Sequence, residues 1–202
     1  MKNRKKSSLP AQYIARIGVL TALSAILFLV LEIPVVAFYK LDFSNLPVLL
    51  GAFSMGPIPG LIILILKNLV HLLFKGFGST MGVGNLADLI MGAAYILPAA
   101  LLYERKKTRR TALAGMGLGT LCMIVAGVLV NWLILIPFYM TAFHMSLDKI
   151  IAMATSVLPF VDTEWELLLF VTAPFNLLKG FVIGLITWLI YKPLSPILHV
   201  KK

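Results

Sequence analysis

Residues 111–147 form an uncharged run of 37 positions, with no Asp, Glu, Lys or Arg. As one helix this run would be about 55 Å long, which exceeds the roughly 30 Å hydrocarbon core of a bilayer. We expect the helix to reach about residue 140, with Pro137 as the position where it bends or ends. The whole chain is 60% hydrophobic and 13% charged, whereas soluble domains are near 45–50% apolar and about 25% charged. An ordinary soluble domain is therefore excluded.

The other apolar segments extend this pattern along the chain. The expected helices are about 11–31, 45–56, 58–75, 85–103, 111–140 and 167–191. Two prolines and two glycines at 56–60 separate the second helix from the third, because they remove backbone donors and loosen the chain. Outer loops are expected at 32–44, 75–84 and 162–166, and an amphipathic helix at 146–156. We predict one all-α integral membrane domain over 1–202 with six transmembrane helices.

Basic residues gather in three patches separated by apolar stretches. They are Lys2, Arg4, Lys5, Lys6 and Arg16; then Arg105, Lys106, Lys107, Arg109 and Arg110; then Lys192, Lys201 and Lys202. Six helices place all three patches on one side, and the positive-inside rule makes that side, with both termini, cytoplasmic. The partner expected for these patches is the lipid bilayer and not a nucleic acid, since no aromatic-rich soluble surface accompanies them.

Polar side chains inside apolar helices mark a candidate ligand site. A charge at mid-bilayer costs about 2.5–3.5 kcal/mol, and Lys179 lies about 12 residues into the last helix. Asn176 shares its helix face, and Asn131 on the antiparallel fifth helix reaches the same layer. Two amides and an ammonium suit a planar heteroaromatic ring that bears carbonyls and ring nitrogens. The alternative is an interhelical clamp, in which each asparagine contributes about 1 kcal/mol to the bundle.

A second polar group lies on the third helix. Lys67 and His71 are four positions apart, Asn68 lies beside them in sequence, and Asp88 on the next helix is the expected partner of Lys67. Structural pairing at the cavity edge is the preferred interpretation, and a proton relay is the alternative. A metal site is not expected from one histidine, one acid and a lysine.

Catalysis by this chain alone is not expected. The glycines at 76–84 follow no strand and lack the lysine–hydroxyl pair of a nucleotide-binding loop. The sequence also offers no nucleophile–base pair. We predict that the protein is not an enzyme and has no cofactor.

Four sequence motifs, in order, resemble those of one family. The run YKLDFSNLP at 39–47 resembles the first loop of the riboflavin-specific substrate-binding component of energy-coupling-factor (ECF) vitamin transporters. Gly56-Pro57 with LKNL at 66–69, GVGNLA at 82–87 and PFNLLKG at 174–180 are similar to later parts of that family. The resemblance covers about 10–192.

This resemblance implies a function and a set of binding residues. The chain would be a high-affinity riboflavin-binding subunit in the plasma membrane of a prokaryote, working with a transmembrane coupling protein and two cytoplasmic ATPases. The flavin would lie near the outer face under the first loop. The residues implied to bind it are Asn131, Asn176 and Lys179 for the ring, Tyr39, Leu41 and Asp42 from the lid, and Gly84 and Asn85 from the fourth helix, with Lys67 at the cavity edge.

The surface for the coupling protein is expected on the first helix. The family is described by an alanine-x-x-x-alanine motif there, and the literal match is Ala11 with Ala15, at the cytoplasmic edge. Small residues with the same spacing also lie farther along this helix, and they let another helix approach closely. We assign the contact to Gly18, Ala22 and Ala25. Contact through the literal motif and close packing within the chain itself remain alternatives.

Two other functions remain open at this stage. One is a substrate-binding component for another vitamin or for a flavin nucleotide. The other is a small ion-coupled secondary carrier that uses Lys67, His71 and Asp88. Inverted repeats would support a carrier, and residues 1–103 and 104–202 show no convincing symmetry.

Overall fold

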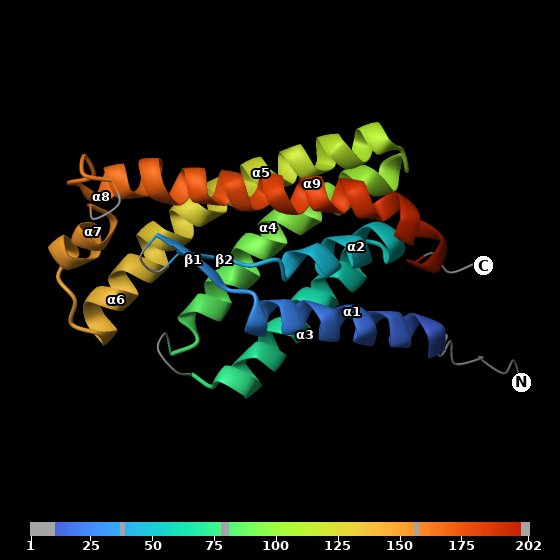
Figure 1. Cartoon of the computed structure of the whole chain (residues 1–202), viewed down its shortest axis with the longest axis horizontal. Helices are drawn as coiled ribbons and strands as arrows, with labels where there is room; N and C mark the ends of the chain where they lie inside the picture. The colour runs from blue at the N-terminus through green and yellow to red at the C-terminus, as the bar shows by residue number, and fades with distance from the viewer. Residues whose placement is uncertain (1–10, 37–38, 78–80, 156–157, 199–202) are drawn as a thin grey trace, which may run out of the picture.

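The computed structural model describes residues 11–36, 39–77, 81–155 and 158–198. It is mostly helical, with long helices packed lengthwise (Figure 1). The helices are α1 Ala11–Val30, α2 Asn45–Met55, α3 Pro57–Lys75, α4 Val83–Arg105, α5 Arg109–Val130, α6 Ile136–Ala142, α7 Leu147–Thr155, α8 Glu164–Glu166 and α9 Ala173–Leu198. The first five predicted helices agree with these bounds to within two residues at each end, when α5, the π-helical segment Asn131–Leu135 and α6 are taken as one continuous helix.

Five helical segments of the described chain are long and apolar enough to cross a membrane. They are α1, α3, α4, the continuous segment Arg109–Ala142 and the segment Glu164–Tyr191. Helix α2 is apolar but has 11 residues, so it is about 16 Å long and too short to span alone. The structure therefore shows five candidate spans, and a sixth span remains a prediction.

The break between α2 and α3 follows from its glycines and proline. Gly56 has a φ of 107°, which favours glycine, and Pro57 opens α3, where its missing N–H costs nothing. A Cβ at Gly60 would lie 2.6 Å from the Cβ of Ala52. The two helices can therefore fold back closely on each other and complete the core beside α4 and α9.

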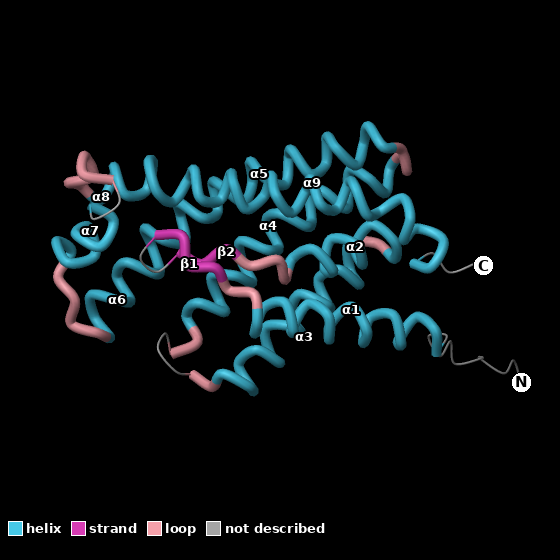
Figure 2. Tube along the Cα trace, viewed as in Figure 1, coloured by secondary structure: helices cyan, strands magenta, loops and turns pink. Residues whose placement is uncertain are grey.

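The predicted outer loop at 32–44 is partly wrong, because it contains a β-hairpin. Strands β1 Ile33–Val36 and β2 Tyr39–Leu41 pair antiparallel, with Ile33 opposite Leu41, and the hairpin lies against the helices (magenta in Figure 2). β-Branched residues in β1 favour this local pairing. Alternation along β2 then turns Tyr39 inward and leaves Lys40 exposed.

Two helices contain π-helical turns, at Asn131–Leu135 and Leu167–Thr172. The irregularity expected at Pro137 thus begins earlier in the chain, because proline cannot donate to the preceding turn and that turn widens. The loop expected at 162–166 is also partly wrong. The Thr163 side chain accepts from the backbone N–H of Glu166, and the Glu166 carboxylate caps the backbone N–H of Thr163, so α8 forms there.

The chain enters α1, turns from α4 to α5 and leaves α9 at the same end of the bundle (Figure 1). The two strands and the α6–α7 region lie toward the other end. The described parts of the basic patches, Arg16 on the first half of α1 and residues 105–110 between α4 and α5, therefore belong to one end. Lys2, Arg4, Lys5, Lys6, Lys201 and Lys202 lie outside the described residues. That this end faces the cytoplasm remains a prediction.

Candidate functional site

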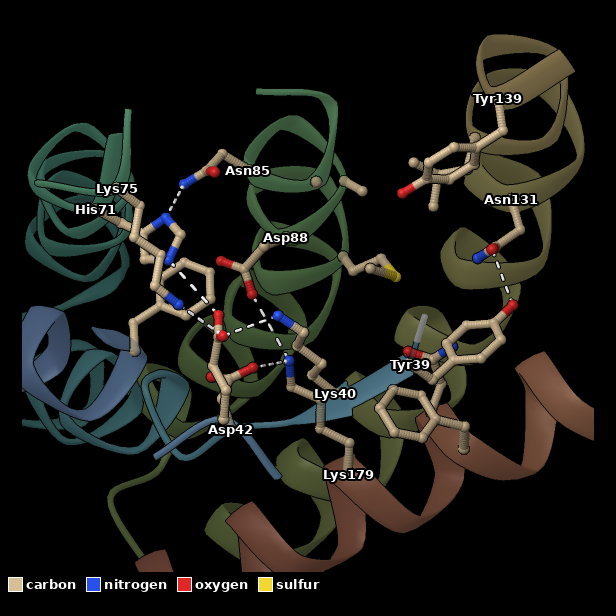
Figure 3. Close-up of a pocket in the computed structure, with 18 of the residues that line it drawn as sticks. Tyr39, Lys40, Asp42, His71, Lys75, Asn85, Asp88, Asn131, Tyr139 and Lys179 are labelled. Carbon is tan, nitrogen blue, oxygen red and sulfur yellow. Dashed lines mark hydrogen bonds and ion pairs between the residues drawn. The ribbon is translucent and has the colours of Figure 1, made fainter. Parts of the chain in front are cut away.

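A cavity of about 270 Å³ opens beneath the hairpin, between α3, α4, the first π-helical segment and α9 (Figure 3). Seven of the nine predicted binding residues line it: Tyr39, Asp42, Gly84, Asn85, Asn131, Asn176 and Lys179. These seven residues come from four separate segments of the chain, and they meet at one cavity. The common polar layer that the sequence predicted is present.

The other two predicted residues lie outside the cavity lining. Lys67 is completely buried behind the wall, and Leu41 is half-buried on β2. We therefore treat Lys67 as a support of the cavity wall. This location agrees with the preferred interpretation of the third-helix polar group as structural pairing at the cavity edge.

Two lysines and two aspartates form a buried ion-pair network on one side of the cavity. The Nζ of Lys179 lies 2.7 Å from Oδ2 of Asp42 and 3.7 Å from Oδ1 of Asp88. The Nζ of Lys67 lies 2.9 Å from the other oxygen of Asp88. The predicted Lys67–Asp88 pair is confirmed, whereas the partner of Lys179 was not foreseen. The four formal charges sum to zero, so an uncharged ligand would leave them balanced.

Asp42 fastens the end of the hairpin to this network. Its Oδ1 accepts hydrogen bonds from the backbone N–H (3.0 Å) and the hydroxyl (2.5 Å) of Ser44. Burial alone would raise the pKa of the Asp42 carboxyl, but Lys179 and Lys67 outweigh it and hold this pKa well below its usual range. Asp42 is therefore ionised at neutral pH, and the hairpin is tied to α9.

The opposite side of the cavity is built from neutral hydrogen-bonding groups. The Tyr39 hydroxyl donates to Oδ1 of Asn131 at 2.9 Å and lies 2.5 Å from the Thr172 hydroxyl. The Asn176 amide donates to the carbonyl of Thr172 at 2.9 Å. A Cβ at Gly127 would lie 2.4 Å from Nδ2 of Asn176. Gly127 therefore lets α5 and α9 approach closely enough to place both asparagines in one layer.

Aromatic rings complete the wall, and sequence reasoning had assigned Tyr39 to the site but missed Phe28, Tyr139 and Phe175. The rings of Tyr39 and Phe175 are 5.1 Å apart, and Tyr139 and Phe28 also line the cavity. Such rings suit the faces of a planar ligand. The position of Phe175 next to Asn176 was the available signal.

Glu32 organises the mouth of the cavity and was also missed as a site residue. Its carboxylate lies 3.0 Å from Nζ of Lys40 and 2.6 Å from Nζ of Lys75. It also lies 3.6 Å from Nε2 of His71. These contacts join the end of α1, strand β2 and the end of α3. Burial raises the pKa of Glu32, but the hydrogen bonds and charges of Lys75 and Lys40 outweigh it, so the pKa lies below its usual value of 4.5.

The first helix presents small residues in two directions. Ala11, Ala15, Gly18 and Ala22 are exposed on one side, and no atom lies within 4 Å of a Cβ built at Gly18. Ala25 is 2% exposed and packs into the chain's own interior. A partner helix can therefore reach Gly18 and Ala22 but not Ala25. The literal alanine pair belongs to the same exposed stripe.

Comparisons with known proteins agree with this architecture. The model of the family "ECF transporter, substrate-specific component" matches residues 12–191. A protein of Staphylococcus aureus (strain TCH60) named riboflavin transporter RibU is 30% identical, over 96% of this chain and 97% of its own length. One of Bacillus subtilis (strain 168), named riboflavin transporter FmnP, is 27% identical, over 79% of this chain and 78% of its own length.

A solved structure has the same fold. It is described as the S component of a bacterial ECF transporter, and it superposes with a TM-score of 0.69 at 27% identity. The alignment covers 94% of this chain and 98% of the other. The family match extends over most of the chain and includes the elements that build the cavity. The chain therefore belongs to the family of substrate-specific components of ECF transporters.

Proposed function

We propose that this protein is the riboflavin-binding subunit of an ECF transporter, and that it holds riboflavin in the cavity beneath the hairpin. The observation that carries the proposal is that Asn131, Asn176 and Lys179 line one cavity. The names of the relatives in Staphylococcus aureus and Bacillus subtilis support the choice of riboflavin. The protein acts as a transporter subunit and not as an enzyme.

The chemistry of the cavity fits a flavin ring. Its carbonyls and ring nitrogens match the amides of Asn131 and Asn176 and the ammonium of Lys179. Its apolar faces match the rings of Tyr39 and Phe175. The ring is uncharged at neutral pH, which keeps the buried ion-pair network balanced. Asp42, with Gly84 and Asn85 at the start of α4, would contact the ribityl hydroxyls.

Transport would need partners that recognise the exposed surface of the chain. We place the coupling protein on the small-residue stripe of α1, at Ala11, Ala15, Gly18 and Ala22, because close helix contact in lipid depends on packing. Two cytoplasmic ATPases would supply the energy. The end of the bundle with the basic patches would face the cytoplasm of a prokaryotic cell.

Riboflavin titration of the purified protein tests the proposed ligand. Riboflavin fluorescence should be quenched on binding. The dissociation constant should be nanomolar, which corresponds to a binding free energy of about −12 kcal/mol. Asn176→Ala should weaken binding by about 1–3 kcal/mol, because ring atoms lose a buried partner. The matched control is Leu178→Ala, which removes a side chain from a 44% exposed position on the same helix. No quenching at micromolar protein, or equal affinity of both variants, would contradict the assignment.

Glu32 should make the mouth of the cavity acid-sensitive. Because its pKa in the folded protein is below 4.5, its ion pairs stabilise the closed mouth above that pH and are lost as the pH falls through the lowered pKa. Glu32→Gln should therefore release riboflavin faster at pH 7, by up to about fivefold for a partly exposed pair. Stopped-flow measurements across pH should show the wild-type rate approaching that of the variant below pH 4.5. Parallel pH profiles for the two proteins would rule out this role.

A further inference from the structure

A second cavity, separate from the flavin site, lies on the outer surface between α5 and α9. Its volume is about 520 Å³. Its walls include Leu113, Gly117 and Leu121 from α5 and Leu177, Phe181 and Trp188 from α9. None of the described residues that line it is charged. We call it the α5–α9 groove.

Glycines shape this groove, because one allows the two helices to approach closely and another leaves open space beside them. Helices α5 and α9 run side by side (Figure 1). A Cβ at Gly180 would lie 2.7 Å from the hydroxyl oxygen of Thr120, so the two helices meet closely at that point. Outside the seam, no atom lies within 4 Å of a Cβ built at Gly117. Leu121 and Phe181, each 62% exposed, flank this gap. The groove is therefore an open apolar channel on the lipid-facing surface.

The hydroxyl of Thr120, which lines the groove, already has a hydrogen-bond partner. It donates to the carbonyl of Met116 at 2.9 Å within its own helix. From Leu113 to Leu121 the groove extends about 12 Å along α5. An apolar channel of this kind fits a lipid acyl chain.

Exposed arginines lie beyond the basic end of the groove. Arg109 and Arg110 open α5 and are exposed. Arg109 is four residues before Leu113 and Arg110 is seven residues before Gly117, so helical periodicity places both on the groove side of α5. Across positions 104–110 there are five basic residues and one acid, Glu104. An apolar groove that ends at clustered arginines complements an acyl chain joined to an anionic headgroup.

We propose that the α5–α9 groove binds an anionic phospholipid, with an acyl chain between the helices and its phosphate at Arg109 and Arg110. Guanidinium groups bind phosphate oxygens in pairs, and basic sites between transmembrane helices suit anionic headgroups. Each basic side chain near such a headgroup contributes about fivefold in affinity. The two arginines therefore give about a 25-fold preference for an anionic lipid over a neutral one.

Native mass spectrometry of the delipidated full chain tests this site with two lipids, phosphatidylglycerol and phosphatidylcholine with identical acyl chains. The wild type should prefer phosphatidylglycerol about 25-fold. Arg109→Gln/Arg110→Gln should lower that preference to near one. Gly117→Leu should reduce retention of both lipids, because the new side chain fills the open channel.

Matched controls separate the groove from general charge and bulk. Arg105→Gln/Lys107→Gln removes the same charge from the neighbouring turn, and Ala114→Leu places the same leucine side chain at another exposed position of α5. Both should retain lipid as the wild type does, and unchanged flavin binding by every variant would show an intact fold. Equal retention of the two lipids by the wild type would overturn the proposal. So would a Gly117→Leu variant that keeps its phosphatidylglycerol preference but no longer co-purifies with the coupling protein, since the groove would then hold a protein helix.

Discussion

Replacing Lys179 by Met should reduce both the stability of the protein and its affinity for riboflavin. The substitution leaves the carboxylate of Asp42, whose side chain is 5% exposed, without the ammonium that lies 2.7 Å away. A buried charge that loses its partner costs about 3–5 kcal/mol. Loss of the donors to the ring should weaken binding by a further 1.5–3 kcal/mol or about 10- to 150-fold. Thermal unfolding in detergent and fluorescence titration measure the two effects separately.

A charge-balanced variant distinguishes two roles of Lys179, which are binding riboflavin and neutralising the charge of Asp42. Asp42→Asn/Lys179→Met removes both members of the pair, so it should regain most of the lost stability. The double variant should not regain its affinity for riboflavin. Asp42→Asn alone is the reference, because it loses the same carboxylate of the hairpin but keeps Lys179. If the double variant bound riboflavin as tightly as that reference, Lys179 would serve the ion pair and not the ligand.

Replacing Ala22 by Trp should abolish ATP-dependent riboflavin uptake while riboflavin binding stays near normal. Ala22 is exposed on α1, on the same stripe as Gly18. An indole at this position would keep a partner helix from approaching closely. Uptake by cells that also produce the coupling protein and the ATPases should fall to background, and co-purification with the coupling protein should be lost.

The control for this substitution is Leu129→Trp, which places the same side chain at a 45% exposed position on α5. That variant should transport normally. If Ala22→Trp misfolded and lost binding, Ala22 would pack within its own chain. Normal uptake would place the docking surface elsewhere, with Ala11 and Ala15 as the next positions to test.

Local sequence patterns predicted the helices and much of the cavity. Apolar runs give helix positions directly, because each helix satisfies its own backbone in lipid. Charged and amide groups inside such runs are costly unless they meet partners. For this reason Asn131, Asn176 and Lys179 could be assigned to one layer, and Lys67 could be paired with Asp88.

Tertiary structure decided which groups meet across the layer. Lys179 and Asp42 are separated by 137 positions, and their pairing depends on a hairpin that a loop of mixed composition did not indicate. Gly127 matters because Asn176 packs against it, which no pattern within α5 reveals.

The rotation of α1 shows the same division between sequence and structure. Small-residue spacing on that helix is equally good for Gly18 with Ala22 and for Thr21 with Ala25. Packing against α2 and α3 turns the second pair inward and leaves the first exposed. The sequence by itself determined that this chain is a bundle of membrane helices with a polar layer, because those properties depend on residues close together along the chain. The tertiary structure alone decided which sides of the helices pack together and which charged groups pair. The reason is that helix rotation and close approach depend on contacts between distant segments.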